Sequence, residues 1–157
     1  MDVKRQKTPQ QALQALEKLS AKAEKCSEDA RRLLRRWNID EREWDWILDS
    51  LYRNRFIDDC RYAGAFVREH ASLSNWGPLK IRQSLLSKRI SVEIVDDVMK
   101  DFFMEDVKVR LKPLLERKLK TLGDEPERKV REKLIRFALS KGYDIDDVLA
   151  IMSEILR

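Results

Sequence analysis

Apolar residues recur at the three- and four-residue spacing of helices along most of the chain, and short polar breaks separate the segments. Residues 56–99 hold three such segments, each following residues that favour a helix start: Asp58, Gly77-Pro78 and Ser91. Their apolar faces consist of Tyr62, Ala63, Phe66 and Val67, then Ile81, Leu85 and Leu86, and finally Ile94, Val95 and Val98. This pattern predicts a three-helix unit in the middle of the chain.

Three helices are also predicted before this unit. Thr8 is suited to cap the first, with Pro9 in its first turn and Gln11 completing a capping box. The second helix covers roughly residues 27–37, and the third begins at Asp40, where Glu43 lies at the capping-box spacing. Residues 1–7 are short, polar and cationic, so we expect a flexible N-terminal arm.

The last third of the chain predicts three more helices. The first is a basic segment from about residue 105 to 122, in which Pro113 should start or kink the helix. Residues 123–126 form the clearest break in the sequence. The next helix covers about residues 127–140 and stops at Gly142, which suits a left-handed C-terminal cap, while Asp144 is suited to cap the final helix.

A repeat connects the middle helices of these three groups. An apolar residue, an arginine and a leucine recur at the same offsets, about 50 residues apart: Ala30-Arg31 with Leu34, Ile81-Arg82 with Leu85, and Val130-Arg131 with Leu134. Each copy continues into a turn, an apolar residue, a helix cap and a further apolar helix. We therefore predict an all-α fold, an elongated and curved array of three tandem three-helix repeats covering residues 8–57, 58–104 and 105–157.

The turn that ends each middle helix contains one inconsistency. Asn38 and Gly142 tolerate the left-handed conformation that ends a helix, but the corresponding residue of the second copy is Arg89. An arginine with positive φ costs roughly 1 kcal/mol relative to glycine. We expect either a different turn at Arg89 or a contact that offsets the strain.

Composition and charge narrow the range of functions. The 157 residues are 43% hydrophobic and 39% charged, with four glycines and four prolines, as expected of small helical modules. Lysine and arginine exceed aspartate and glutamate by 33 to 28, which favours an acidic partner such as nucleic acid or an assembly that contains it. That excess is modest for a tight, sequence-independent DNA binder. Cys26 and Cys60 lack the spacing of a metal site or a disulfide framework, and no segment predicts secretion or membrane spanning, so a cytoplasmic location is expected.

The chain offers few residues for catalysis. Its single histidine, His70, has no serine, cysteine or carboxylate at a recognisable catalytic spacing. The acidic pairs at 58–59, 96–97 and 146–147 fall near helix starts, where capping explains them better than metal binding. The sequence contains no glycine-rich phosphate loop, dinucleotide fingerprint or EF-hand loop. We therefore predict that the protein is not an enzyme and uses no metal, cofactor or small-molecule substrate.

Basic residues are the best candidates for function. Those in and around the middle unit are predicted to form a contact surface: Arg61, Arg68, Lys80, Arg82, Lys88 and Arg89. A second basic run lies between Lys108 and Lys120. Other interpretations stay open, because charged helix faces are often only solvated and Arg82, with counterparts in the other repeats, could be a structural element. Trp76 either contacts a partner or anchors its loop on the core.

The middle unit resembles the RecX family of bacterial recombination regulators, and specific motifs carry the resemblance. They are Phe56-Ile57-Asp58-Asp59, Arg61-Tyr62, Gly77-Pro78, Ile81-Arg82-Gln83-Ser84-Leu85 and Lys88-Arg89-Ile90, with Arg89 in place of a glycine. The last repeat is similar in Arg136-Phe137 and Lys141-Gly142-Tyr143. The resemblance covers most of residues 27–157.

This resemblance implies a tandem array of three-helix repeats that binds the RecA recombinase, chiefly in the groove of its filament on single-stranded DNA. RecX proteins limit filament growth and lower the ATPase, strand-exchange and co-protease activities of RecA without chemistry of their own. The resemblance thus places the chain in recombination, DNA repair and the SOS response. The residues themselves also leave open a stand-alone basic DNA-binding protein, with weak direct DNA binding, and a helical scaffold that involves no nucleic acid.

Overall fold

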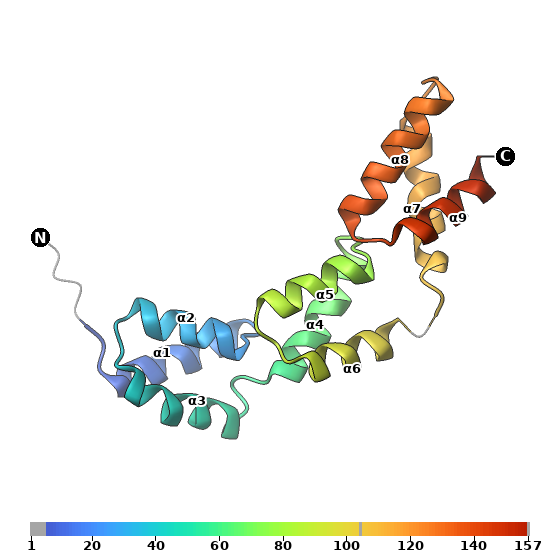
Figure 1. The fold of residues 1–157 in the computed structure, drawn as a ribbon. Coiled ribbons are helices and arrows are strands. Elements are labelled where there is room, and N and C mark those ends of the chain that lie inside the picture. The colour runs from blue at the N-terminus through green and yellow to red at the C-terminus, as the bar shows by residue number, and fades with distance from the viewer. Residues whose placement is uncertain (1–5, 104, 157) are drawn as a thin grey trace, which may run out of the picture.

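A computed structural model describes residues 6–103 and 105–156, and within them the chain forms nine α-helices and one short 3-10 helix. Figure 1 shows the helices in three groups that follow one another along a curve, with α1 and α9 in the outer groups. The predicted all-α array of three-helix repeats is confirmed. The expected flexibility of the N-terminal arm falls largely on residues 1–5, which lie outside the described residues.

Unit 1 consists of α1 (Pro9–Lys22), α2 (Ser27–Arg36) and α3 (Trp44–Arg53). The capping box at the start of α1 forms as predicted, with Thr8 accepting from the Gln11 N–H at 3.2 Å and Gln11 bonding back to the Thr8 N–H at 2.9 Å. The predicted capping box at Asp40 is wrong. Asp40 instead caps the 3-10 helix Glu41–Glu43, and the Glu43 carboxylate accepts a hydrogen bond from Trp46.

Unit 2 consists of α4 (Asp59–Ser72), α5 (Pro78–Ser87) and α6 (Val92–Phe102). Its helix starts are as predicted. Asp58 accepts a hydrogen bond from the Arg61 N–H at 3.0 Å, Pro78 takes the first position of α5, and Ser91 accepts from the Ile94 N–H at 3.4 Å. These local caps explain why the sequence pattern located the unit correctly.

Unit 3 consists of α7 (Lys108–Thr121), α8 (Glu127–Lys141) and α9 (Ile145–Ile155). Of the two alternatives predicted for Pro113, a helix start there is wrong, because α7 begins at Lys108 and continues through Pro113, whereas a kink there stays a prediction. A proline removes only one backbone donor, and Leu111, Leu114 and Leu115 on both sides of it are buried, so packing maintains the helix. Gly142, with φ 95°, ends α8 in the predicted left-handed cap.

Each unit has its own hydrophobic core. The helix pairs that pack most extensively all lie within one unit. The buried leucines and isoleucines of the repeated motif are central to these cores: Leu34 in unit 1, Ile81 and Leu85 in unit 2, and Leu134 in unit 3. Cys26 is an exception, because it precedes α2 of unit 1 in the sequence but is fully buried in the core of unit 2. The units therefore stack as separate modules with small contacts between them.

The same turn ends the middle helix of every unit. Asn38, Arg89 and Gly142 all have positive φ, at 55°, 56° and 95°. The N–H of the next residue reaches back five positions in each case, from Ile39 to Leu34, from Ile90 to Leu85 and from Tyr143 to Ala138, as in a Schellman motif. The turn at Arg89 therefore does not differ, and its exposed side chain has no hydrogen bond or ion pair to the described residues that would offset the strain.

The three middle helices lie end to end. In Figure 1, α2, α5 and α8 follow the inner side of the curve, and the start of one faces the end of the next. The end of α8 contacts the start of α5, and the end of α5 contacts the start of α2. We call α2, α5 and α8 together the inner row. The contacts between their ends fix its curvature.

The unit 2–unit 3 junction is made largely by backbone. The N–H of Gly77 donates to the Lys141 carbonyl at 2.6 Å, and the N–H of Leu79 donates to the Gly142 carbonyl at 3.0 Å. Free N–H groups at the start of α5 thus meet free carbonyls at the end of α8, an arrangement that also aligns the two helix dipoles favourably. A Cβ at Gly77 would lie 2.6 Å from the Gly142 oxygen, so only glycine permits this approach.

The unit 1–unit 2 junction is made by side chains. Lys88, at the end of α5, donates to the Asp29 carboxylate of α2 at 2.9 Å. The Ser27 N–H and hydroxyl both donate to Asp59 of α4, each at 2.8 Å. Arg61 of α4 forms an ion pair with Glu24 at 2.8 Å. Charged and polar side chains therefore connect these two units where backbone connects the other two.

Candidate functional site

The inner row concentrates the positive charge of the protein. The whole chain has 33 lysines and arginines against 28 acidic residues, and α2, α5 and α8 hold twelve of the former but only four of the latter. The remaining residues are therefore acidic on balance, with 21 cationic against 24 acidic side chains. A modest net charge of +5 thus hides a strong segregation of charge onto one row of helices.

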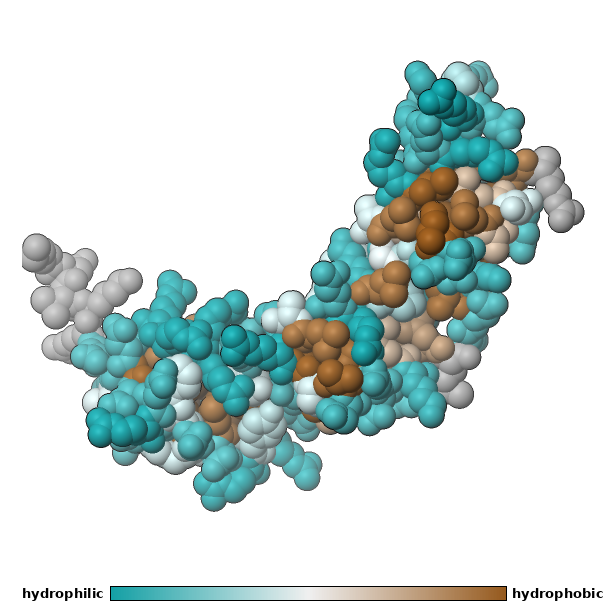
Figure 2. All heavy atoms as spheres, viewed as in Figure 1, coloured by the Kyte–Doolittle hydropathy of each residue, from teal (hydrophilic) through white to brown (hydrophobic). Residues whose placement is uncertain are grey.

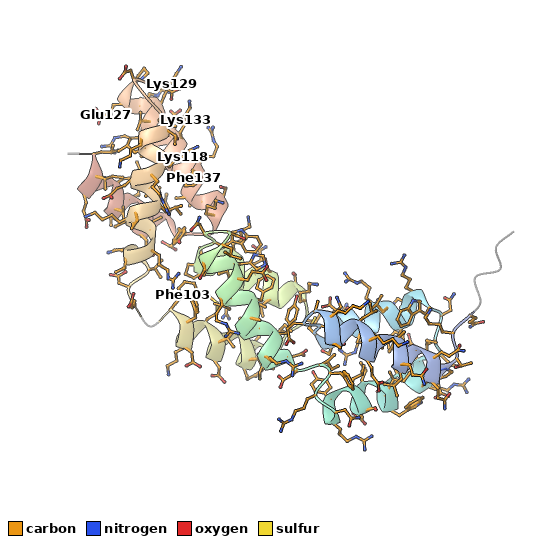
Figure 3. All side chains as sticks on the ribbon, turned by 180° about the vertical axis from the view of Figure 1, so that it is seen from behind. Phe103, Lys118, Glu127, Lys129, Lys133 and Phe137 are labelled. Atoms are coloured by element: carbon orange, nitrogen blue, oxygen red, sulfur yellow. The ribbon has the colours of Figure 1, made fainter. Side chains whose placement is uncertain are left out.

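Helix α8 of unit 3 has the largest net charge in the row, with six cationic and two acidic residues, against four and two in α2 and two and none in α5. Six of the 15 residues of α8 are lysine or arginine, and Arg128, Lys129 and Arg136 are exposed. Figure 3 shows Lys129, Lys133 and Phe137 along α8. Lys118 of α7 lies over the Phe137 ring at 5.1 Å. In Figure 2, hydrophilic side chains cover the far end of this unit, whereas hydrophobic patches lie over unit 2 and the base of unit 3.

Three of the predicted contact residues are placed at the junctions. Lys88 and Arg61 hold unit 1 against unit 2, as described above, and Arg61 also donates to the Arg55 carbonyl at 3.1 Å. Lys80 donates to the Ser140 carbonyl of α8 at 3.2 Å. These side chains have intramolecular partners, so their first effect is on the shape of the array.

Arg82 forms an ion pair with Asp96 of α6, within unit 2. Its counterpart Arg131 pairs instead with Glu127 of its own helix at 3.4 Å. The repeated arginine therefore does not share one structural partner across the units, although the neighbouring apolar residues of the motif do share a place in the core.

Arg68 and Arg89 differ from the other four predicted residues. Both are exposed, and neither side chain forms a hydrogen bond or ion pair with any residue in the ranges that the structure describes. Their guanidinium groups are available for an external anion or carboxylate.

The Lys88–Asp29 pair sets the electrostatics of the unit 1–unit 2 junction. Burial by itself would raise the pKa of Asp29, yet hydrogen bonds from Lys88 and from the Cys26 N–H outweigh burial and hold that pKa below its usual value. The same bond with Asp29 raises the pKa of Lys88. Next to the pair, burial raises the pKa of the Cys26 thiol to about 11, which keeps it protonated and unreactive.

Trp76 anchors its loop and is half-buried. Its indole stacks on the His70 ring at 4.1 Å, and the Lys80 ammonium lies 4.5 Å from the indole centroid. Phe66 packs against His70 at 4.2 Å and makes an edge contact with Trp76 at 6.2 Å. Trp76 therefore anchors its loop on the core of unit 2, and His70 belongs to the same aromatic cluster. Contact of Trp76 with a partner stays a prediction.

A metal site and a membrane-spanning helix each have requirements that the described residues do not meet. Across residues 6–103 and 105–156, no three histidine, cysteine or acidic side chains come together as a metal ion would need. Within the same ranges, no helix combines the length and apolar character that crossing a membrane requires.

The cations of α8 were missed as a group by the sequence analysis, which selected residues of the middle unit. Their signal was present as the high density of lysine and arginine between 127 and 141. It becomes meaningful only when α2, α5 and α8 are known to form one row, because the helices are far apart in the sequence.

Comparisons with known proteins agree with this architecture. A model of the RecX second three-helix domain matches residues 58–99, and a model of the RecX third three-helix domain matches residues 108–152. Proteins called Regulatory protein RecX are similar: one from Clostridium tetani is 32% identical over 74% of this chain and 54% of its own length. One from Clostridium botulinum is 30% identical over 85% of this chain and 63% of its own length. The chain thus spans between about half and two thirds of the length of these relatives.

Two solved structures share the fold. The crystal structure of RecX from Lactobacillus salivarius aligns with a TM-score of 0.81, covering 94% of this chain and 96% of that chain at 22% identity. A second structure, of regulatory protein RecX, aligns with a TM-score of 0.80 over 92% of this chain and 71% of that chain at 24% identity. At these identities the likeness establishes the three-unit fold alone.

Proposed function

This chain belongs to the RecX family of regulatory proteins, and on that premise we propose that it binds the filament that the RecA recombinase forms on single-stranded DNA. It modulates, and mainly inhibits, the ATPase, strand-exchange and co-protease activities of RecA. It does so without chemistry of its own, in the cytoplasm, during recombination, DNA repair and the SOS response.

The observation that carries this proposal is the charge of the inner row. A filament on single-stranded DNA is a long, polyanionic object, and an elongated array can follow it over several subunits. The inner row has twelve cationic and four acidic residues, while the rest of the chain is acidic on balance. Such segregation favours one face of the array toward the filament and disfavours the others.

Among the predicted contact residues, we propose direct contact for Arg68 and Arg89, because their guanidinium groups have no partner among the described residues. The other four act by holding neighbouring elements in place. The α8 cations Lys129 and Arg136 extend the contact surface to unit 3. Lys80, Lys88 and Arg61 therefore matter for the curvature that presents this surface, and Arg82 matters for the packing of α5 on α6.

The test is the ATPase activity of RecA on single-stranded DNA, measured over a range of salt concentrations. We expect inhibition at protein concentrations well below those needed to coat the DNA. Inhibition that appears only at DNA-saturating concentrations would instead support a stand-alone DNA-binding protein that competes for the strand.

A pair of matched variants tests the inner row itself. Lys129→Glu with Arg136→Glu reverses two exposed charges on α8, and we expect it to weaken inhibition about tenfold and to flatten its salt dependence. Lys18→Glu with Lys22→Glu makes the same charge change on exposed residues of α1, outside the row, and should have a much smaller effect. Equal losses in the two variants would show that only net charge matters.

A further inference from the structure

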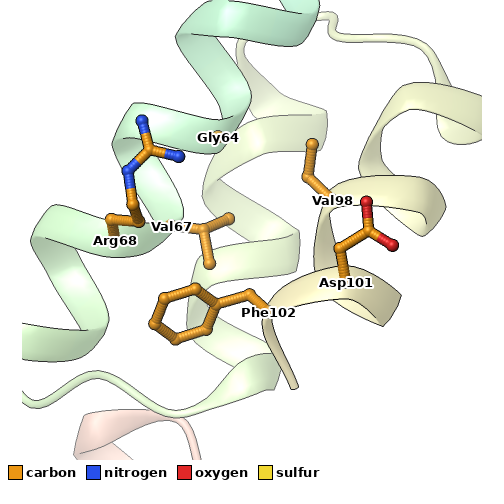
Figure 4. A pocket seen from close by; sticks show the side chains of 6 residues that line it. All are labelled: Gly64, Val67, Arg68, Val98, Asp101 and Phe102. Atoms are coloured by element: carbon orange, nitrogen blue, oxygen red, sulfur yellow. The ribbon is translucent and has the colours of Figure 1, made fainter. Parts of the chain in front are cut away.

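A hollow between α4 and α6 combines an apolar floor with two charged side chains on its rim. Its volume is about 270 Å³, and it is lined by Gly64, Val67, Arg68, Val98, Asp101 and Phe102. Figure 4 shows Arg68 and Asp101 on opposite sides of the hollow, with Val67 and Phe102 between them. The hollow lies in unit 2 on helices outside the inner row.

The floor and the glycine explain why the hollow exists. Val67 is 1% exposed, so the floor belongs to the unit 2 core. A Cβ at Gly64 would lie 3.3 Å from Arg68 Nη1, which shows that the guanidinium extends back over the glycine. Phe102 is held in place by the Phe103 ring, 5.1 Å away, and by the Arg110 guanidinium, 4.6 Å from its centroid. The hollow is therefore bounded by restrained side chains.

The two charged side chains on the rim, Arg68 and Asp101, have no intramolecular partner among the described residues. Arg68 and Asp101 are both exposed, and within residues 6–103 and 105–156 neither side chain forms an ion pair or hydrogen bond. Two opposite charges that flank an apolar floor without pairing leave both groups available to a partner.

We propose that this hollow is the anchor point for a RecA subunit of the filament, which inserts one apolar side chain between α4 and α6, places an acidic residue against Arg68 and places a basic residue against Asp101. This inference rests on the proposed function. It adds the place on this protein that contacts the RecA subunits of the filament. An apolar side chain seated in a restrained pocket is typical of the centre of a protein interface.

The charges favour protein over nucleic acid as the occupant. A phosphate backbone would gain from Arg68 but would be repelled by Asp101 across the same hollow. The apolar floor also offers nothing to a phosphate. A protein bound in the groove of a filament contacts the sides of the groove as well as its bottom. The inner row can therefore face the DNA-containing core of the filament while the hollow contacts the RecA subunits at the side.

The test compares two substitutions at Gly64. Gly64→Met fills the hollow from its own helix, and we expect it to weaken binding to RecA–single-stranded DNA filaments about tenfold or more while leaving binding to bare single-stranded DNA unchanged. Gly64→Ala is the matched control, because it adds only a Cβ beside a flexible arginine end and should change filament affinity less than about threefold. Thermal unfolding of both variants, followed by circular dichroism, shows that the helix is intact.

A second variant keeps the proposal open to refutation if Gly64→Met destabilises the fold. Arg68→Glu with Asp101→Lys exchanges the rim charges, leaves the net charge unchanged and leaves the hollow open. We expect about a tenfold loss of filament affinity, because the partner's charges would then face like charges. If Arg68 and Asp101 act only within the molecule, the exchanged variant should bind the filament as tightly as the wild-type protein.

The outcomes separate the two proposals. Filament binding by the wild-type protein together with unchanged binding by Gly64→Met and by the exchanged rim overturns the anchor point alone. Equal losses on filament and bare strand overturn it in favour of a nucleic-acid contact. Failure of the wild-type protein to bind the filament overturns the proposed function, and the anchor point with it.

Discussion

The two junctions of the array join equivalent helix ends by different chemistry. At the unit 2–unit 3 junction, Gly142 ends α8 and Gly77 precedes α5, and their backbones touch. At the unit 1–unit 2 junction, the equivalent positions are Arg89 and Cys26, and the helices are connected by the Lys88–Asp29 ion pair. The same turn thus demands glycine only where a neighbouring backbone occupies the space that a side chain would need.

This difference explains the anomalous Arg89. Its φ of 56° matches the turn geometry of the other units, and the strain of roughly 1 kcal/mol is tolerated because nothing lies against its side chain. A backbone junction is rigid and insensitive to solution conditions, whereas a side-chain junction responds to charge. Variants at each junction can break or sharpen this contrast.

Gly142→Ala should have the largest effect. A Cβ at Gly142 would lie 2.6 Å from the Lys80 backbone nitrogen, and the positive φ adds strain, so we expect a loss of about 3 kcal/mol in the free energy of unfolding. Urea unfolding measures it. Gly123→Ala is the control, because Gly123 also has positive φ but a Cβ there would meet no atom within 4 Å, so only about 1 kcal/mol should be lost. Equal losses would mean that strain, and not the close approach, requires the glycine.

Asp29→Asn should come next. It removes the partner of a partly buried ammonium and weakens the acceptor for the Cys26 N–H, so we expect a loss of about 2 kcal/mol in the free energy of unfolding, measured in the same way. Glu132→Gln breaks the exposed Arg128–Glu132 pair and should cost less than about 0.5 kcal/mol. A loss at Asp29 no larger than at Glu132 would show that the pair does not hold the junction.

Acid should open the unit 1–unit 2 junction selectively. The folded pKa of Asp29 is lowered from 3.8, so its stabilisation is complete above about pH 4 and is lost as the pH falls through the lowered pKa. The folded pKa of Lys88 is raised from 10.5, so its stabilisation is complete below about pH 10 and is lost as the pH rises through the raised pKa.

Amide hydrogen exchange, corrected for its intrinsic pH dependence, tests whether acid opens the unit 1–unit 2 junction and leaves the unit 2–unit 3 junction closed. Below about pH 4, protection of Cys26 should fall in the wild-type protein, while protection of Gly77 and Leu79 at the backbone junction should persist. In the Asp29→Asn variant the protection of Cys26 should no longer depend on pH in this interval. Parallel loss at both junctions would mean that acid acts on the whole fold.

Arg89→Gly should have the smallest effect on the fold, and with the opposite sign. Relief of the positive-φ strain should raise the free energy of unfolding by about 1 kcal/mol, as measured by urea unfolding. If Arg89 contacts the filament, the same variant should inhibit RecA less despite its greater stability. A destabilised variant would show that the arginine side chain supports the turn in a way that its exposure does not suggest.

The sequence pattern predicted the parts of the fold that depend on neighbours in the chain. The caps at Thr8, Asp58 and Ser91, the glycine end at Gly142 and the repeated motif all follow from residues within one or two helical turns. No helix starts at Pro113 because burial of the leucines around it, a tertiary effect, outweighs the lost hydrogen bond.

The candidate site was harder to predict because its geometry depends on distant residues. Lys88 and Asp29 are 59 positions apart, and Lys141 and Ser74 are 67 apart, so no local pattern reveals that they meet. Lys80 and Lys88, which were predicted as contact residues, have intramolecular partners across the junctions. Arg68 and Arg89 stay as predictions because contact with a partner is untested.

The end-to-end succession of α8, α5 and α2 gives the molecule a polarity. Three helix axes run in the same sense from the tip of unit 3 to the outer end of unit 1, so the two ends of the array expose opposite helix termini. No rotation exchanges one end for the other. On a filament whose subunits all point the same way, the two orientations of the array are therefore chemically distinct, and only one of them can bring the α8 cations to any given end of the binding site.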